Sequence, residues 1–323
     1  MRRIGIEVLA CAALLGLPGI ARAGEPATPA AATAPATGTT GTEAPPAPAT
    51  GASTPPASPR WPGPRTGLRD IAWVDLQGAY NPLGIQVIGG IQRRHVYEVD
   101  TQRNIEWAYL QAGIGGMISP AIAQASVHLE WMPAAVFTLR FQADVIGYFG
   151  TMGALRQFDA RPSRWDVDRK DGLAGHDRTG VAFRTLIQPT LALQVSRVIL
   201  RSQCNLAMYG FTGNGQYFYD YENDSLMART ELLVFNPTYL LIEAWKARRD
   251  ALLYVGALYD VTYAAVSGVR RQRVGGVIVW QPKDPWGPLD RMRIYVMGGY
   301  ILEDENRQGE PFLAGGIGTD FDL

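Results

Sequence analysis

The chain has 323 residues, and its 30 lysines and arginines balance 30 aspartates and glutamates to a formal net charge of zero. Bulk electrostatics therefore predict neither nucleic acid nor an acidic macromolecule as a partner. Of its two cysteines, Cys11 lies in the leader described next, so Cys204 has no intramolecular disulfide partner in the mature chain and no cysteine-based metal site is expected.

Residues 1–23 have the organisation of a secretory signal peptide. Arg2 and Arg3 precede an apolar run over residues 8–20, and Ala21-Arg22-Ala23 fits the small-x-small cleavage rule. The apolar run is shorter than the about 20 residues that a membrane-spanning helix needs. We therefore expect this segment to be removed.

Residues 24–65 are dominated by alanine, proline, threonine and glycine, and Trp61 is their first large apolar residue after the leader. Such a composition buries too little apolar surface to fold, and alternating prolines keep it extended. We expect a disordered linker in the periplasm, either as a tether that contacts the cell wall or as a segment without a partner.

From residue 66 to residue 323 the sequence predicts one all-β domain. Its clearest segment is residues 135–149, in which odd positions such as Phe137, Leu139 and Phe141 are apolar and even positions include Arg140 and Asp144. This period of two is that of a strand with two unlike faces. A soluble protein turns the apolar face inward, whereas a transmembrane barrel turns it toward lipid.

The same alternation recurs along the domain, and no uninterrupted apolar run approaches the 18 residues of a membrane helix. We count about 13 candidate strands, of roughly the length that a tilted strand needs to cross a bilayer. They cover residues 70–80, 84–97, 104–118, 121–131, 135–149, 181–193, 198–209, 226–235, 238–247, 252–263, 271–281, 292–302 and the C-terminal segment. Closed bacterial barrels have an even number of strands, so we predict 12, with 14 as the alternative and residues 238–247 as the first suspect for double counting.

Three features favour a membrane barrel over a soluble one. Aromatic residues lie near the ends of apolar faces, as in the girdles of membrane barrels: Trp131, Phe149, Tyr209, Phe235, Tyr263 and Tyr300. Long polar loops over residues 150–178 and 212–225 alternate with tight turns at Met132-Pro133, near Ser196 and at Asn236-Pro237. The last strand places Ile317, Phe321 and Leu323 on one face at the end of the chain.

On these patterns, residues 66–323 resemble the broad class of Gram-negative outer-membrane β-barrels, without matching a specific family. The resemblance implies a closed antiparallel transmembrane β-barrel in the bacterial outer membrane. It also implies outer-membrane lipid and the barrel-assembly machinery as partners, with no nucleic acid.

The polar faces of the strands then line the lumen with charges of both signs. The predicted lumen-lining residues are Asp75, Arg94, Glu130, Arg140, Asp144, Arg184, Arg201, Arg229, Glu231, Glu243, Asp260 and Arg293, together with Asp320. Mixed charges in a barrel of this width are able to pair across the lumen and narrow or close it. Two hypotheses stay open: a narrow selective pore, and a salt-bridged core that holds the barrel shut.

Catalysis is not expected. Ser126 and His128 share one strand face and would be neighbours, but on our register both point into the lumen, away from a lipid substrate. His95 and His176 are read as a strand-end residue and a loop residue. The glycine pairs at 89–90, 115–116, 275–276, 298–299 and 315–316 indicate strand kinks and close approaches, so we predict no cofactor and no metal.

The function favoured by the sequence is a narrow pore or transporter for small solutes or ions with a charge-lined lumen. The alternatives are a structural or adhesive barrel with a periplasmic tether, a lumenal or interface lipid hydrolase, and a secreted soluble β-barrel. Coordinates with Phe137, Leu139 and Phe141 in a dry interior would overturn the membrane interpretation.

Overall fold

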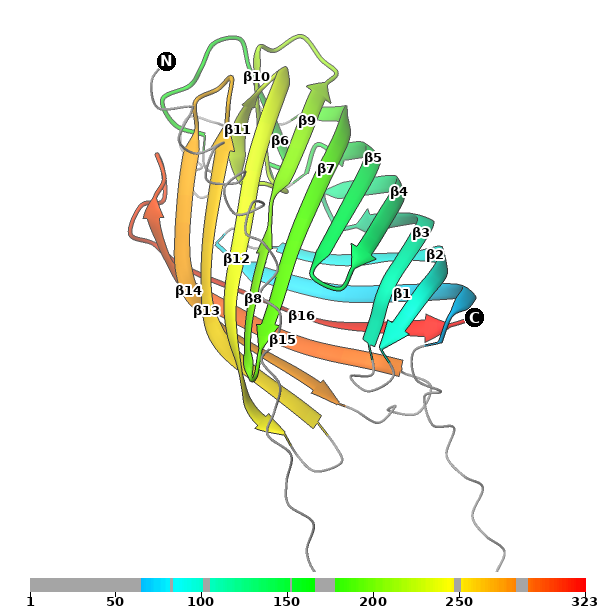
Figure 1. Cartoon of the computed structure of the whole chain (residues 1–323). Coiled ribbons are helices and arrows are strands. Elements are labelled where there is room, and N and C mark those ends of the chain that lie inside the picture. The colour runs from blue at the N-terminus through cyan, green and yellow to red at the C-terminus, as the bar shows by residue number, and fades with distance from the viewer. Residues whose placement is uncertain are drawn as a thin grey trace, which may run out of the picture. The chain divides into compact units, whose positions relative to one another are not determined.

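The computed structural model in Figure 1 describes residues 65–81, 84–100, 105–151, 153–165, 178–246, 251–282 and 290–323. The predicted signal peptide, almost all of the predicted linker and His176 lie outside the described residues. Among the residues that are described, no helix has the length and apolar character to cross a membrane.

The described residues form strands of two sizes, long ones in the barrel wall and four-residue ones in two loops. The strands are β1 (Gly67–Tyr80), β2 (Gly84–Asp100), β3 (Ile105–Ile118), β4 (Ile122–Ala134), β5 (Phe137–Phe149), β6 (Leu155–Phe158), β7 (Thr179–Val195), β8 (Val198–Gln203), β9 (Asn205–Phe211), β10 (Tyr217–Asp220), β11 (Ser225–Ala228), β12 (Thr230–Lys246), β13 (Ala251–Ala264), β14 (Arg270–Pro282), β15 (Asp290–Glu303) and β16 (Pro311–Asp322).

The long strands close into an antiparallel barrel. Thirteen strands form one sheet, and β1 pairs with both β2 and β16, which closes the ring. The segments β8 and β9 lie end to end between β7 and β12, interrupted only at Cys204, so they count as one wall strand. Thirteen segments thus make 12 wall strands, and the predicted fold and strand number are confirmed.

The predicted turn at Asn236-Pro237 is wrong, and it explains the surplus strand. Pro237 lies inside β12 and pairs with Asp260 of β13. On the edge of β12 that does not pair with β13, the partner strand changes from β9 to β8. This change lies opposite the break at Cys204. Proline is tolerated because the hydrogen-bond ladder is already interrupted there. Pro189 of β7 faces the same break, where its carbonyl accepts the Cys204 N–H at 3.0 Å.

The short connections lie close to where the sequence places them. Ser196, with a φ of 54°, begins the two-residue connection between β7 and β8. The turn predicted at Met132-Pro133 falls instead at Ala135-Val136, because β4 continues to Ala134 through an irregularity after Trp131.

The outer face of the barrel is apolar. On β5, Phe141, Val145 and Phe149 are 44%, 48% and 47% exposed, whereas Asp144 is only 4% exposed. This is the reverse of a soluble strand and matches a wall that faces lipid. Among the predicted girdle residues, Trp131, Phe149 and Tyr300 are exposed, but Tyr209 is buried and Phe235 packs against the interior core. The prediction for these two is wrong because their strand faces point inward.

One end of the barrel is filled by a small sheet that we call the plug. It consists of β6, β10 and β11, with β10 in the centre and residues 221–224 as the turn between β10 and β11. Figure 1 shows it at the end where β5 and β9 finish. Phe218, Tyr219, Leu226 and Met227 are fully buried in a core shared with wall strands. The segments of these two loops that form β6, β10 and β11 therefore fold into the barrel, although the loops were expected to be polar and external.

Candidate functional site

A polar cavity of about 550 Å³ lies inside the barrel, between the plug and the opposite end. Its wall is built from β1, β2, β3, β4, β5, β7 and β8, and Glu222 of the plug turn also lines it. Thr138, next to the first residue of β5, and the exposed Arg201 of β8 also line it. The cavity thus runs from the plug toward the barrel end that carries the shortest turns.

The strand alternation accounts for which residues reach this cavity. Five of the predicted lumen-lining residues line it, one from each of β1, β4, β5, β7 and β8: Asp75, Glu130, Arg140, Arg184 and Arg201. Three acidic groups and three arginines line the cavity once Glu222 is included, so the lining is balanced in charge.

The remaining charges of the wall strands lie beside this lining and pair with neighbours in the wall. Arg94 contacts Glu106 at 2.5 Å, and Asp144 accepts from Arg184 Nε at 2.6 Å. Asp260 pairs with Arg273. Arg293 bridges Asp75 at 2.9 Å and Asp320 at 3.5 Å.

These pairs join neighbouring positions in the wall and do not reach across the lumen. Arg140 and Glu130, 3.9 Å apart, stand on the adjacent strands β5 and β4, and Arg184 and Asp144 on the adjacent strands β7 and β5. Neighbouring strands are about 5 Å apart, so inward side chains on them meet without reaching the barrel axis. The pairs therefore follow the wall and leave a cavity in the middle.

Two predicted residues have other roles, and a third lies away from the cavity. Arg229 is exposed between β11 and β12 and donates to the Gly213 carbonyl, so its assignment to the lumen lining is wrong. Glu231 is fully buried and accepts backbone N–H groups of Val266 at 2.7 Å and Ser267 at 2.9 Å. It thus ties β12 to the β13–β14 turn. Glu243 is half-buried on β12, near the end opposite the plug.

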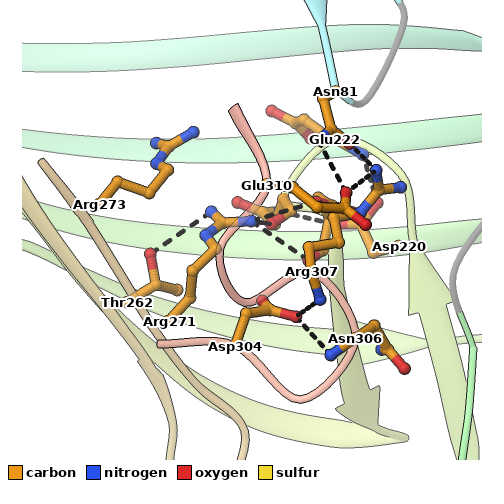
Figure 2. Close-up of polar contacts among 12 residues, drawn as sticks. Asn81, Asp220, Glu222, Thr262, Arg271, Arg273, Asp304, Asn306, Arg307 and Glu310 are labelled. Carbon is orange, nitrogen blue, oxygen red and sulfur yellow. Dashed lines mark hydrogen bonds and ion pairs between the residues drawn. The ribbon is translucent and has the colours of Figure 1, made fainter. Parts of the chain in front are cut away.

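Polar contacts join the plug turn to several parts of the wall. Arg184 Nη1 of β7 donates to Glu222 Oε1 at 2.9 Å, and Arg271 Nη1 of β14 donates to the carbonyls of Asn223 at 2.9 Å and Asp224 at 3.2 Å. Figure 2 shows Arg271 and Arg307 directed toward this acidic turn. The Asp224 carboxylate lies 3.6 Å from Arg271 and 3.3 Å from Arg307.

Arg307 is itself held in place by the β15–β16 turn and the turn after β1. The Asp304 carboxylate accepts the backbone N–H groups of Asn306 at 2.8 Å and Arg307 at 3.0 Å. Asn81 accepts from Arg307 and donates to Glu310 at 2.9 Å, as Figure 2 shows. Burial raises the pKa of the Asp304 carboxyl above its ordinary value.

Asp220 is the most deeply buried acid of the plug. Its carboxylate accepts from Tyr148 of β5 at 2.9 Å and from the backbone N–H of Glu222 at 3.2 Å. Burial, and then the nearby Glu222 charge, raise the pKa of Asp220 to about 6, although these hydrogen bonds act in the opposite direction. The hydrogen bond from Tyr148 to Asp220 thus joins the wall to a plug carboxyl whose pKa is raised.

The histidine site considered from the sequence lies in the wall beside the cavity. His128 is buried, and its Nε2 lies 3.3 Å from Gln92 Oε1. Ser126 lines the cavity, but His128 does not. The expectation that the chain is not an enzyme stays a prediction.

Sequence reasoning missed the plug contacts and an amide set that lines the cavity. The missed residues of these contacts are Glu222 and Asp224 of the plug turn, Arg271 of β14 and Arg307 of the β15–β16 turn. Glutamine recurs on the polar faces of successive strands, which is the signal that would have revealed the amide set: Gln77, Gln86, Gln124, Gln142, Gln188 and Gln203. Attention to formal charge alone left these residues aside.

A closed antiparallel barrel with an apolar outer face resembles the broad class of outer-membrane β-barrels. The chain is similar to the beta domain of the Bordetella autotransporter BrkA, with 11% identity and a TM-score of 0.41 over 79% of this chain and 99% of that one. It is also similar to the KdgM porin in complex with disordered oligogalacturonate, with 8% identity and a TM-score of 0.35 over 79% and 99%. The NalP translocator domain from Neisseria meningitidis has 10% identity and a TM-score of 0.33 over 80% and 90%. No family model and no curated protein matches the chain.

Proposed function

We propose that the chain forms a narrow, plugged pore in the bacterial outer membrane, which passes small solutes when the plug is displaced. In this proposal the barrel contacts outer-membrane lipid, is inserted by the barrel-assembly machinery, and carries residues 24–65 as a linker in the periplasm. The observation that carries the proposal is the polar cavity of about 550 Å³ enclosed by a wall whose outside is apolar.

The way the wall charges pair supports a pore over a salt-bridged core. A closed core would place opposite charges against each other across the barrel axis. The contacts of Arg140 with Glu130 and of Asp75 with Arg293 instead join positions on the same side of the barrel. These wall pairs therefore leave space for a solute between them.

The plug supplies the closed state. It belongs to the connections between β5 and β7 and between β9 and β12, so it is able to leave without breaking a wall strand pair. When Glu222 withdraws, Arg184 keeps its contact with Asp144. Displacement therefore leaves this wall arginine paired, which lowers the cost of opening.

Conductance of the full chain in planar lipid bilayers tests the proposal. A variant with residues 216–227 replaced by a flexible Gly-Ser linker lacks β10 and β11. We expect the native chain to be mostly closed and this variant to conduct steadily. A folded variant that stays silent in every salt tested would overturn the pore.

Two controls keep the test decisive. Heat-modifiable migration on a gel reports whether the variant retains its closed barrel in cold detergent. If the shortened chain does not fold, the point substitution Asp224→Asn, which keeps the plug but removes a charge from its turn, takes its place. A folded Asp224→Asn barrel with no more openings than the native chain would also count against the pore.

A further inference from the structure

We propose that the cavity binds an uncharged, polyhydroxylated solute, of the size of a mono- to trisaccharide. This inference deepens the proposed function, since it names the class of solute that the pore admits. It rests on three features of the cavity: charges that are balanced in number and mostly paired, amides that are held in pairs, and an indole fixed against the wall.

Five of the six lining charges lie within ion-pair distance of an opposite charge, and the sixth, Arg201, donates to Gln203 Oε1 at 3.0 Å. Arg184 contacts both Asp144 and Glu222, and Asp75 contacts Arg293. With as many arginines as acids, the lining offers no excess charge to attract an ion of either sign. A charged solute would also have to break these pairs, whereas a neutral one leaves them intact.

The glutamines of the lining form three pairs, each fixed by hydrogen bonds in the wall. Gln124 and Gln142 both donate to Asp144 Oδ1, at 2.9 Å and 2.7 Å. A shared acceptor thus sets the orientation of two side-chain amides on neighbouring strands, with their nitrogens directed toward the wall carboxylate.

The other two pairs repeat this arrangement on other parts of the wall. Gln188 and Gln203 both donate to Asn205 Oδ1, the second at 3.4 Å, and Gln86 donates to Gln77 at 3.0 Å. An amide has two donor hydrogens and two acceptor lone pairs, and each of these bonds uses only one site of each amide it joins. The three pairs therefore keep donors and acceptors for a ligand, in positions that the wall has already fixed.

Hydroxyl groups match this lining because each one donates and accepts. A sugar offers such groups around its ring at short spacing, so it is able to use several amides at once. Glu222 adds an acceptor from the plug, because its Oε2 is buried without a hydrogen-bond partner among the described residues. A hydroxyl donated to this oxygen would link the solute to the plug turn.

Trp73 supplies an apolar surface in the same cavity. Its indole lies against the backbone where Gly90 and Gly115 pair across β2 and β3. A Cβ at Gly90 would stand 3.2 Å from the indole nitrogen, and one at Gly115 would stand 3.4 Å from an indole carbon. The paired glycines thus make room for the ring. A fixed aromatic beside polar groups suits the C–H surface of a sugar ring.

Calorimetric titration of the folded full chain tests the inference, in an amine-oxide detergent that carries no sugar. The probes are maltose and maltotriose as neutral saccharides, trigalacturonate as an anionic one and triglycine as a zwitterion. We expect the neutral saccharides to bind most tightly. A cavity that binds trigalacturonate or triglycine at least as tightly as maltotriose, or that binds no saccharide in either the native or the plug-shortened chain, would overturn the inference.

Substitution of the lining glutamines tests whether their side-chain amides bind the saccharide. The doubly substituted chains Gln124→Met/Gln142→Met and Gln188→Met/Gln203→Met should each weaken maltotriose binding about tenfold, since each loses two hydrogen-bonding side chains. Gln272→Met is the matched control, because Gln272 of β14 bonds Tyr259 and Glu303 and does not line the cavity. Unchanged binding in both folded double variants would contradict the proposed site.

The outcome separates this inference from the pore. Steady conductance of the plug-shortened chain without saccharide binding would leave the pore standing and remove the sugar site. Saccharide binding that depends on the glutamines, in a barrel that never conducts, would leave the site standing and remove the pore.

Discussion

Removal of one charge from the plug turn should open the barrel. The Asp224 carboxylate lies 3.3 Å from Arg307 and 3.6 Å from Arg271, and it accepts from the Tyr219 hydroxyl at 2.8 Å. Its side chain is 7% exposed, and those of Arg271 and Arg307 are 10% and 2% exposed. Asp224→Asn keeps the shape of the side chain and removes the charge that faces two buried arginines.

The magnitude follows from the cost of leaving a buried charge without its partner. Breaking a buried pair by removing one member costs about 3–5 kcal/mol. The cost falls on the closed state, because in the open state water reaches the arginines. At 1.4 kcal/mol for each tenfold change, the ratio of open to closed barrels should rise by about a hundredfold to a few thousandfold.

Single-channel recording in planar bilayers measures this ratio directly. Asp70→Asn is a matched control, because Asp70 pairs with Arg93 at 2.7 Å on the outer surface, where the side chains are 42% and 68% exposed. The control should open no more often than the native chain. An Asp224→Asn barrel that is folded and opens at the native frequency would refute the role assigned to the plug turn.

Three further predictions concern the plug, the lipid face and the interior. The raised pKa of Asp220 means that the closed plug holds this proton more tightly than the open one, so closure is favoured at low pH and weakens as pH rises from 3.8 to about 6. The open fraction should rise over this range, by up to about a hundredfold, and Asp220→Asn should flatten the profile; identical profiles would contradict the assignment. Val145→Arg should destabilise folding into lipid vesicles by about 2–4 kcal/mol, measured by urea titration, because Val145 is exposed on the outer face; an unchanged midpoint would place it away from lipid. Glu231→Gln should lower the temperature at which the barrel unfolds on gels, with a loss of about 2–3 kcal/mol in stability, because Glu231 accepts buried backbone N–H groups. Glu243→Gln is the control and should not lower it; equal unfolding temperatures for Glu231→Gln and the native chain would show that the buried acceptor is dispensable.

The barrel wall was predictable because each strand separates two environments. On β5 the apolar residues Phe141 and Val145 face outward and Asp144 faces inward. The alternation of apolar and polar residues therefore predicted both the strand and which of its faces points outward. The strand count was harder to predict at Pro237. A proline is tolerated inside β12 because the partner strand is interrupted at Cys204. The local sequence around Pro237 does not reveal that pairing.

The plug was not predicted because its strands are only four residues long and are buried on both faces. Polar and apolar residues alternate along a strand only when one of its faces lies in a polar environment. All four residues of β11 (Ser225–Ala228) are buried, so this strand has no such face. The signal that remained was apolar residues in a polar loop, namely Phe218, Tyr219, Leu226 and Met227. Such residues indicate that a loop is folded against other parts of the protein.

The interior charges fall into two groups with different consequences for opening. Pairs within the wall, such as Arg140 with Glu130, are unaffected when the plug moves. Asp224 meets Arg271 and Arg307 only while the plug is in place, so these contacts add to the stability of the closed state alone. Arg184 belongs to both groups, because it contacts Asp144 in the wall and Glu222 in the plug. A solute hydroxyl that donates to Glu222 Oε2 leaves this shared contact in place, because Arg184 bonds Oε1, so a bound solute adds to the stability of the closed barrel.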